Sequence, residues 1–347
     1  MLNAWLQFLS DHGARIDEQT QNVVDFDSAG SGNIETGFVA PLTDLGLTAA
    51  SGEDAATFLH NQLTNDVEHL STTEARLAGY CSPKGRLLAT LLMWKSTDNI
   101  LLQLPRQIQP AVQKRLQMFI LRAKVKLADL SEERVVLGLG GRQAADVFKA
   151  WFADLPTQPY AKTDSEAGTL LRVADAFGAP RYQWITSRET AEAAWPVLTA
   201  ALSPVGTARW RLADIHAGIP QITQPTQEQF VPQMVNFELI GGVNFKKGCY
   251  PGQEIVARTQ YLGKLKRRMV SASVDMDARA GEEIYSSADP SQPCGMIVNA
   301  ERTPDDGCDC LAEVKLAALH DGTVHLGSAN GPVLRFLTLP YSLPDAT

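Results

Sequence analysis

The sequence predicts layers of mixed α and β structure, of the α/β or α+β class, followed by a separate small β domain. Up to about residue 263, apolar segments with helical spacing alternate with segments of strand character. Beyond residue 265, short apolar runs recur between turns rich in Gly, Pro and Asp, which is typical of a small β-barrel or sandwich. The 347 residues are also too many for one compact core, so two or three domains are expected.

Local patterns predict the individual elements of the first part. Leu2, Trp5, Leu6 and Leu9 are spaced like one face of a helix. Polar residues ahead of the apolar segment AATFLHNQL predict a helix that begins near residue 52 to 54 and ends at about Leu63. Further helices are expected over residues 107–120, 143–152, 189–202 and 207–218, and strands over residues 85–94, 100–104, 124–130 and 134–139.

The glycine-rich segment VVLGLGGRQAADVF superficially suggests a dinucleotide site. Gly138, Gly140 and Gly141 lie in an expected strand-to-helix turn, but the full G-x-G-x-x-G spacing is missing. We therefore interpret this segment as a plain turn.

The overall charge argues against a protein that coats nucleic acid or an anionic membrane. Lys and Arg number 31 against 39 Asp and Glu, for a net charge of −8, so any site for a polyanion must be local. The densest run of cations is Arg258, Lys264, Lys266, Arg267 and Arg268. A solvated turn and strand edge is favoured for this run over a site for a polyglutamyl tail or an RNA backbone.

Cysteine usage and the N-terminus predict a cytoplasmic protein with free thiols. The five cysteines are odd in number and follow no framework spacing, which fits a reducing compartment. The N-terminus lacks a basic region and a long apolar core, and no run approaches the roughly 20 apolar residues of a membrane span. Cys308 and Cys310 are read as strand residues near a turn, because no second cysteine pair supports a metal site.

The segment KKGCYPGQEIVAR, residues 246–258, contains a helix start. Pro251 and Gly252 precede the expected helix, and Gln253 and Glu254 lie in its first turn, where the helix dipole favours an acid. Glu254 and Arg258 have the spacing and orientation of an i,i+4 ion pair.

Cys249 has two interpretations on these grounds alone. Lys246, Lys247 and the following helix N-terminus would stabilise a thiolate, and Gly248 would let a partner approach the backbone. Free cysteine is equally often a packed, buried residue. The six histidines are dispersed, so no Cys–His pair can be proposed from the sequence.

The same segment resembles the signature K-G-C-Y-x-G-Q-E-x-x-x-R of the YgfZ family. These bacterial folate-binding proteins are related to a mitochondrial iron–sulfur assembly factor and, more distantly, to the aminomethyltransferase (T-protein) of the glycine cleavage system. The resemblance extends to SGEDAATFLHNQLTNDV, GYCSPKGRLLA and FVPQMVNFELIGGVNFKKGCY, and so covers nearly the whole chain.

This resemblance implies an α+β fold of three lobes around a central channel that binds tetrahydrofolate or a derivative. Residues 1–263 would form the folate-binding region as two interleaved α+β lobes, and residues 264–347 a C-terminal β-barrel. The implied role is an accessory protein for assembly or maintenance of iron–sulfur clusters in client enzymes, including tRNA-modifying ones. Cys249 would be the functional thiol, close to the channel, in a site shaped by Lys247, Gly248, Tyr250, Gly252, Gln253, Glu254 and Arg258.

Two departures from related patterns matter. The T-protein branch carries an Asp pair after the glycine that matches Gly85, whereas this chain has Arg86 and Leu87 there. An arginine would repel a cationic methylene-transfer centre, so T-protein activity is not expected and a classical enzyme is not favoured. A folate-dependent one-carbon transferase of the aminomethyl type remains the alternative.

The second departure concerns the folate site. Many relatives have R-x-E-A-G-x-P, whose glutamate would pair with the pterin edge, and His216 occupies that position here. Imidazole cannot make the bidentate contact of a carboxylate, but Asp214, close by on the same helix, could replace it. Tyr80, Lys84 and Arg86 are expected at the channel mouth. The expected partners are folate and iron–sulfur client enzymes, with direct nucleic-acid binding possible but not favoured and no membrane.

Overall fold

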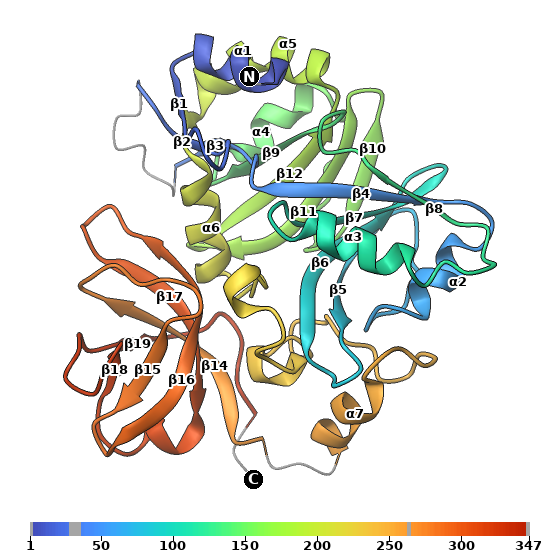
Figure 1. Cartoon of the computed structure of the whole chain (residues 1–347). Coiled ribbons are helices and arrows are strands. Elements are labelled where there is room, and N and C mark those ends of the chain that lie inside the picture. Colours follow the sequence, from blue (N-terminus) through green and yellow to red (C-terminus); the bar gives the residue numbers. More distant parts are fainter. Residues whose placement is uncertain (1–2, 28–35, 262–264, 345–347) are drawn as a thin grey trace.

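The protein has three sheet-based lobes, described here from a computed structural model (Figure 1). The structure describes residues 3–27, 36–261 and 265–344. The N-terminal part holds two sheets with their helices, and the C-terminal sheet lies beside them (Figure 1). None of the helices in these described ranges is both long and apolar enough to span a bilayer.

The first lobe is built on a six-stranded mixed sheet. Its strands, in spatial order, are β10 (Lys162–Ser165), β11 (Gly168–Ala176), β12 (Ala179–Thr186), β9 (Val135–Gly140), β3 (Phe38–Pro41) and β13 (Ser203–Pro204). Its outer face is covered by α1 (Ala4–Asp11), α4 (Ala144–Val147), the 3-10 turn η1 (Phe148–Ala150) and α5 (Arg188–Ala201), beside the hairpin β1 (Ala14–Ile16) and β2 (Val23–Phe26). The predicted N-terminal helix is confirmed, because Trp5, Leu6 and Leu9 are buried in this core; Leu2 lies outside the described residues.

The second lobe is a five-stranded antiparallel sheet inserted into the first. Its strands, in spatial order, are β5 (Ala75–Cys81), β6 (Leu87–Lys95), β7 (Asn99–Pro105), β4 (Leu45–Ser51) and β8 (Lys126–Asp129), with α2 (Ala55–His60) and α3 (Gln109–Gln117) on one face. The chain leaves the first sheet after β3 and returns to it at β9. The expected hairpin is β6 and β7, whose apolar runs are buried on both faces.

An apolar core joins the two lobes. Leu77 and Trp94 of the second sheet belong to the same buried cluster as Leu171 of the first and Trp210 of α6 (Thr207–His216). Since Trp94 and Trp210 are almost fully buried, this interior can position the polar groups that project from neighbouring strands.

A long segment without sheet structure links α6 to α7 (Gln253–Tyr261), interrupted by the 3-10 turns η2 (Gln224–Thr226) and η3 (Pro232–Val235). Asn236 closes η3 in the left-handed conformation, with φ of 56°, a region that asparagine tolerates better than most residues. Its side-chain amide donates to the backbone oxygen of Met269 at 2.8 Å, which ties this segment to the C-terminal lobe.

The C-terminal lobe is a six-stranded antiparallel sheet that curls into a half-barrel (Figure 1). Its strands, in spatial order, are β18 (Val324–Leu326), β15 (Glu283–Ser286), β16 (Asp289–Arg302), β17 (Cys308–Lys315), β14 (Arg267–Val274) and β19 (Arg335–Leu337), and the turn η4 (Leu316–Leu319) follows β17. Cys308 and Cys310 pack into its core. No group of three or more His, Cys, Asp or Glu among the described residues is placed to hold a metal ion. The expected boundary between residues 263 and 264 lies outside the described residues.

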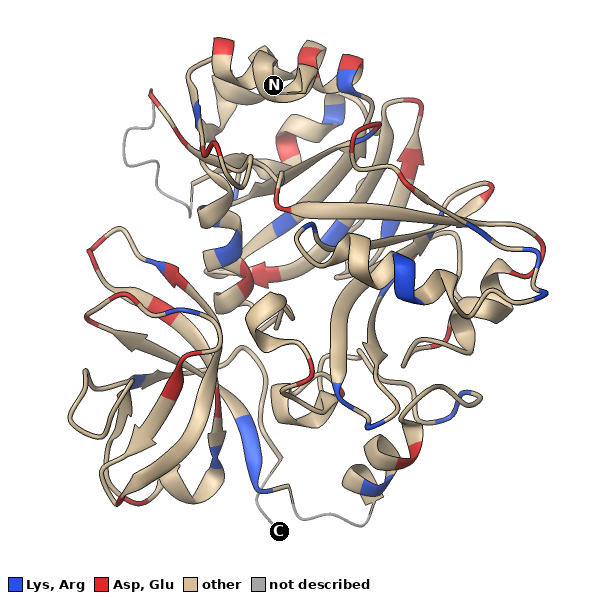
Figure 2. Cartoon of the chain, viewed as in Figure 1, with Lys and Arg blue, Asp and Glu red and all other residues tan. Residues whose placement is uncertain are grey.

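Charged side chains of both signs are interspersed along all three lobes (Figure 2). In the basic run, Arg267 pairs with Glu313 at 2.8 Å and Arg268 pairs with Glu238 at 2.5 Å, so these two guanidinium groups already have carboxylate partners. Lys264 lies outside the described residues. The cations that were grouped by sequence are therefore partly neutralised within the fold.

Arg268→Met should lower the free energy of unfolding by about 3–5 kcal/mol, because it leaves the carboxylate of Glu238 buried without its cation. Both side chains are at most 8% exposed, so water cannot replace the lost partner. The urea midpoint measures the loss, and the double variant Arg268→Met/Glu238→Leu should recover most of it. A loss that the double variant does not reduce would show that the Arg268–Glu238 ion pair is not what Arg268 contributes to stability.

Candidate functional site

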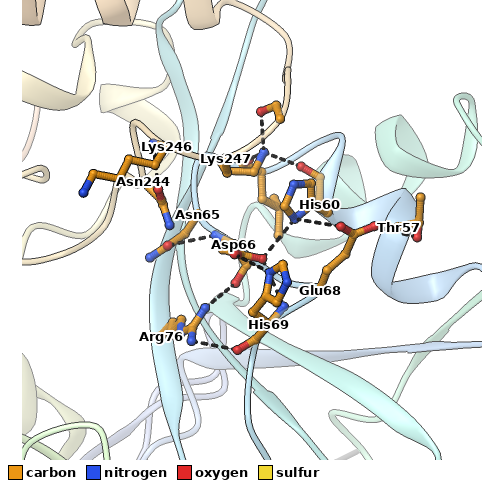
Figure 3. Close-up of polar contacts among 12 residues, drawn as sticks. Thr57, His60, Asn65, Asp66, Glu68, His69, Arg76, Asn244, Lys246 and Lys247 are labelled. Atoms are coloured by element: carbon orange, nitrogen blue, oxygen red, sulfur yellow. Dashed lines mark hydrogen bonds and ion pairs between the residues drawn. The ribbon is translucent and has the colours of Figure 1, made fainter.

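Residues 247–249, Lys-Gly-Cys, form what we call the KGC segment. The side chain of Lys247 holds this segment against the C-terminal end of α2. Its Nζ donates to the backbone oxygens of His60, Leu63 and Gly248, the last two at 3.0 and 3.2 Å (Figure 3). Carbonyls at a helix C-terminus have no partner within the helix and carry partial negative charge, so an ammonium is a fitting partner. The ammonium also lies 4.9 Å from the centre of the Tyr250 ring.

Burial lowers the pKa of Lys247 from its ordinary 10.5 to about 8. The negative groups Asp66, Cys249 and Glu68 oppose this shift but do not cancel it. Lys247 therefore combines a structural contact with an amine that loses its proton unusually easily.

Two glycine turns pack backbone to backbone behind the motif. A Cβ atom on Gly252, whose φ is +80°, would lie 2.4 Å from the backbone oxygen of Ser82 and 2.5 Å from the nitrogen of Gly85. Gly85 also has a positive φ, of +69°, and a Cβ there would meet Ile255 at 2.9 Å. No side chain fits between the two turns, which explains why both positions are glycine.

The helix after the motif begins at Gln253, as the sequence predicts. Glu254 and Arg258 are both exposed and form no ion pair with each other, so the expected i,i+4 pair is wrong. An exposed pair gains little in water against the side-chain entropy that it costs. Tyr250 is 7% exposed, and burial raises the pKa of its hydroxyl well above the ordinary range.

Cys249 is exposed, whereas the other four cysteines, Cys81, Cys294, Cys308 and Cys310, are buried. Burial raises the pKa of each of these four thiols, that of Cys81 to about 12. The helix N-terminus lies four residues beyond Cys249, so the thiol is not part of the first turn. Of the two interpretations that the sequence left open, burial in a core is therefore excluded.

A polar cluster lies beneath the KGC segment (Figure 3). Asp66 accepts from Nδ1 of His60 at 3.1 Å and from Nδ1 of His69 at 2.8 Å. Glu68 lies 3.9 Å from the same nitrogen of His60, and Arg76 donates to the backbone oxygen of Asp66 at 2.9 Å. Burial would raise the pKa of Asp66, but the His69 amide and the two imidazoles outweigh it and lower the pKa.

Three hollows, which we call the central hollows, adjoin one another through shared lining residues. The outer hollow, of about 670 Å³, is lined by charged and polar side chains that include Asp44, Arg106, Arg211, Gln221 and Arg279. The inner hollow, of about 60 Å³, shares Pro105, Asp214, Ile219 and Gln221 with it. The motif-side hollow, of about 380 Å³, shares Leu77 and Tyr160 with the inner one and includes Asn65, Gly241 and Asn244.

Asp214 lies where the outer and inner hollows meet. Its Oδ1 accepts from Arg181 at 2.7 Å, and its Oδ2 accepts from Gln221 at 3.2 Å. Arg181 stacks over the ring of Trp210, 4.6 Å from its centre. Burial raises the pKa of Asp214, although the Arg181 guanidinium opposes the shift.

Unpaired polar atoms face the same space. Among the described residues, Gln103 Nε2 and Gln183 Oε1, both on side chains lining the inner hollow, have no hydrogen-bond partner, and neither has Asp44 Oδ1 at the outer hollow. Buried polar groups are nearly always satisfied, so these atoms point to a polar ligand or bound water.

The other residues expected at the folate site lie elsewhere. Nε2 of His216 contacts Asp309 of β17 at 2.7 Å, and its ring packs on Phe177. Tyr80 is buried in the core between the second sheet and α2. Arg86 donates to the backbone oxygen of Gln229 and lines a separate hollow beside the half-barrel. None of these three, nor Cys249, lines the three central hollows.

Sequence reasoning missed Arg181, His60 and Asp66 as site residues. Arg181 follows no motif, and its role appears only because β12 carries it opposite α6. His60 and Asp66 are six residues apart on either side of a turn, a spacing that carries no chemical signature.

Comparisons with known proteins agree with the resemblance of the motif. No family model matches the chain. It is 31% identical over 303 residues to the tRNA-modifying protein YgfZ of Edwardsiella ictaluri, covering 84% of this chain and 88% of the relative. It is 30% identical over 311 residues to the protein of the same name from Cronobacter sakazakii, covering 88% and 93%. The chain belongs to the YgfZ family.

The fold of this YgfZ family member is that of an aminomethyltransferase. The glycine cleavage system aminomethyltransferase T of Bartonella henselae superposes with a TM-score of 0.78 over 96% of both chains, at 17% sequence identity. The expected three-lobed α+β fold is thereby confirmed, with a curled half-barrel as the C-terminal lobe.

In this YgfZ family member, a thiol reagent at pH 7 should modify Cys249 well before the other four cysteines, because it alone is exposed among them. The measurement is the time course of thiol modification with mass mapping of the labelled peptide. Cys249→Ala should remove the fast phase, and unfolding in urea should release all five thiols of the wild type. A second thiol that reacts at the same rate in the native protein would contradict this.

The lowered pKa of Lys247 predicts a specific pH dependence of stability. Between about pH 8 and 10.5, an unfolded lysine keeps its proton while the folded Lys247 has lost it, so stability rises with pH through this window. Thermal melts of wild type and Lys247→Met at pH 7 to 10 isolate the effect, since every other group titrates in both proteins. The melting temperature of the wild type should rise relative to that of Lys247→Met as the pH increases. A constant difference would mean that the carbonyl contacts keep the ammonium charged.

Proposed function

We propose that this protein binds tetrahydrofolate or a derivative and supports tRNA modification by assisting iron–sulfur enzymes, with Cys249 as its working thiol. The names of the relatives support the connection to tRNA modification. The observation that carries the role of the thiol is its exposure on a segment that Lys247 pins to α2, while the remaining cysteines are buried. A thiol retained only for packing would not be held out to solvent in this way.

The central hollows suit a folate chemically. The edge of a pterin ring presents N–H donors, and the carboxylate of Asp214 keeps free lone pairs beside its bonds to Arg181 and Gln221. The unpaired Gln103 Nε2 and Gln183 Oε1 offer one further donor and one acceptor. The outer hollow, of about 670 Å³, is within the usual size of a small-molecule site.

Cations at the outer hollow suit the glutamate tail of a folate. Arg106 and Arg211 line this hollow, and each also pairs with acidic groups of the fold: Arg106 with Asp129, and Arg211 with Asp44. Arg279 also lines it, and within the described residues its guanidinium makes no ion pair. A bound folate would therefore have its ring toward Asp214 and its tail toward these arginines.

A one-carbon transferase is disfavoured by the residue at the position that carries an acid in the transferase branch. The position expected to carry an acid in the transferase branch is Arg86, whose guanidinium is engaged with Gln229 outside the central hollows. A cationic transfer centre would need a negative group nearby, and Asp214 is already paired with Arg181. The proposal therefore assigns folate a binding role and leaves the chemistry to the thiol.

Asp214→Asn should weaken folate binding, whereas Cys249→Ala should not. Tetrahydrofolate at a hundredfold excess over its Kd stabilises a native state by about 2.7 kcal/mol, which corresponds to a melting shift of about 2–4 °C for a chain of this size. The shift of each variant is measured against its own ligand-free protein. Asp309→Asn is the matched control, because it removes a buried carboxylate that contacts His216 and does not line the hollows.

Cys249→Ala should nevertheless fail to restore iron–sulfur-dependent tRNA modification in cells that lack the protein. If Asp214→Asn keeps the full melting shift on addition of tetrahydrofolate, folate binds outside the central hollows. If Cys249→Ala fully restores tRNA modification in those cells, Cys249 is not a working thiol.

A further inference from the structure

The imidazole of His60 is buried, oriented and faces the motif. His60 ends α2, and its side chain is only 8% exposed. Asp66 holds its Nδ1 at 3.1 Å, so the neutral ring carries its proton on Nδ1 and presents the lone pair of Nε2. Within the described part of the chain, Nε2 makes no hydrogen bond, while a Cβ atom built on Gly248 would lie 3.5 Å from it.

The unpartnered Nε2 of His60 therefore faces Gly248, and Cys249 is the next residue along the chain. Lys247 fixes this register, because its ammonium bonds to the backbone oxygens of both His60 and Gly248. The thiol is exposed and makes no hydrogen bond to His60 in the structure, so a rotation of its side chain or a small shift of the loop must bring the two together. Such contacts are often long when no substrate is bound.

We propose that His60, oriented by Asp66, accepts the proton of the Cys249 thiol and so generates the nucleophilic thiolate. The S–H bond breaks, the electron pair stays on sulfur, and the proton goes to Nε2. The resulting imidazolium is stabilised by the carboxylate of Asp66 and by the nearby Glu68. This inference rests on the proposed role of Cys249 as the working thiol and adds the group that activates it.

The other charged groups around His60 fit this assignment. Lys247 precedes Gly248 and Cys249 on the motif, and its ammonium is held by the backbone oxygens of His60 and Gly248. His69 bonds to the opposite oxygen of Asp66, but its side chain is 80% exposed and it makes no contact with the motif. His69 therefore provides a control histidine on the same carboxylate.

The test is the rate at which iodoacetamide alkylates Cys249 in the full-length protein, with the site confirmed by peptide mass. The thiolate displaces iodide, so the rate reports how much thiolate is present. An ordinary thiol is only a few per cent ionised at pH 7, so His60→Gln should lower the rate there by about tenfold. The wild-type advantage should disappear above about pH 9, where a thiol ionises without help. His69→Gln should leave the rate unchanged.

Gly248→Ala is a second variant that keeps both reacting side chains. Gly248 has no positive φ, and its Cβ would meet Nε2 at ordinary contact distance, so the methyl group should screen the imidazole without disturbing the fold. It too should slow alkylation at pH 7 while the melting temperature stays the same. If His60→Gln unfolds and exposes the buried thiols, the alkylation rate of Gly248→Ala decides whether His60 activates Cys249.

Alkylation of His60→Gln and Gly248→Ala at the wild-type rate would overturn the proposal, and so would an equal slowing by His69→Gln. This assay needs neither folate nor a client enzyme. Slow alkylation of His60→Gln together with full cellular rescue by Cys249→Ala would leave the proton transfer intact and refute the proposed function instead.

Discussion

The geometry of the thiol segment depends on one ammonium group and the carbonyls that surround it. Lys247 contacts the backbone oxygens at the end of α2 and just beyond it, where carbonyls lack helical partners, and through them ties the motif to the second sheet. The segment itself has no regular secondary structure between Gly242 and Tyr250. Lys247 thereby holds the residues before Cys249 against the end of α2, where His60 lies.

The same contact explains why the exposed loop that carries Cys249 can have a fixed conformation. Burying a lysine is unfavourable, and the lowered pKa of Lys247 is a direct sign of that cost. Three backbone oxygens offset it, two of them from residues at or near the C-terminal end of α2. The glycine turns at Gly85 and Gly252 then hold the far side of the motif against the β5–β6 turn. The thiol is thus presented on a rigid support although it faces solvent.

The central hollows and the thiol lie in separate places in the molecule. Asp214 and Arg181 lie at the inner end of the hollows, whereas Cys249 lies outside them on the side of the motif. The motif-side hollow adjoins the inner hollow at Leu77 and Tyr160, which line both, and Cys249 lines neither of them. His216 does not line these hollows; it joins α6 to the half-barrel through Asp309.

The sequence by itself determined the elements whose signals are local. The helical spacing of Trp5, Leu6 and Leu9, the hairpin of β6 and β7 and the start of α7 at Gln253 follow from side-chain periodicity and turn residues. The motif identified the family and singled out Cys249, but its exposure was decided by the tertiary structure. Only the tertiary structure decided which distant residues meet, because ion pairs such as Arg181 with Asp214 and contacts such as Lys247 with His60 join segments whose separation along the chain has no periodicity. It also decided against the Glu254–Arg258 pair and against His216 in the hollow, since solvent exposure and the docking of the half-barrel are properties of the folded chain.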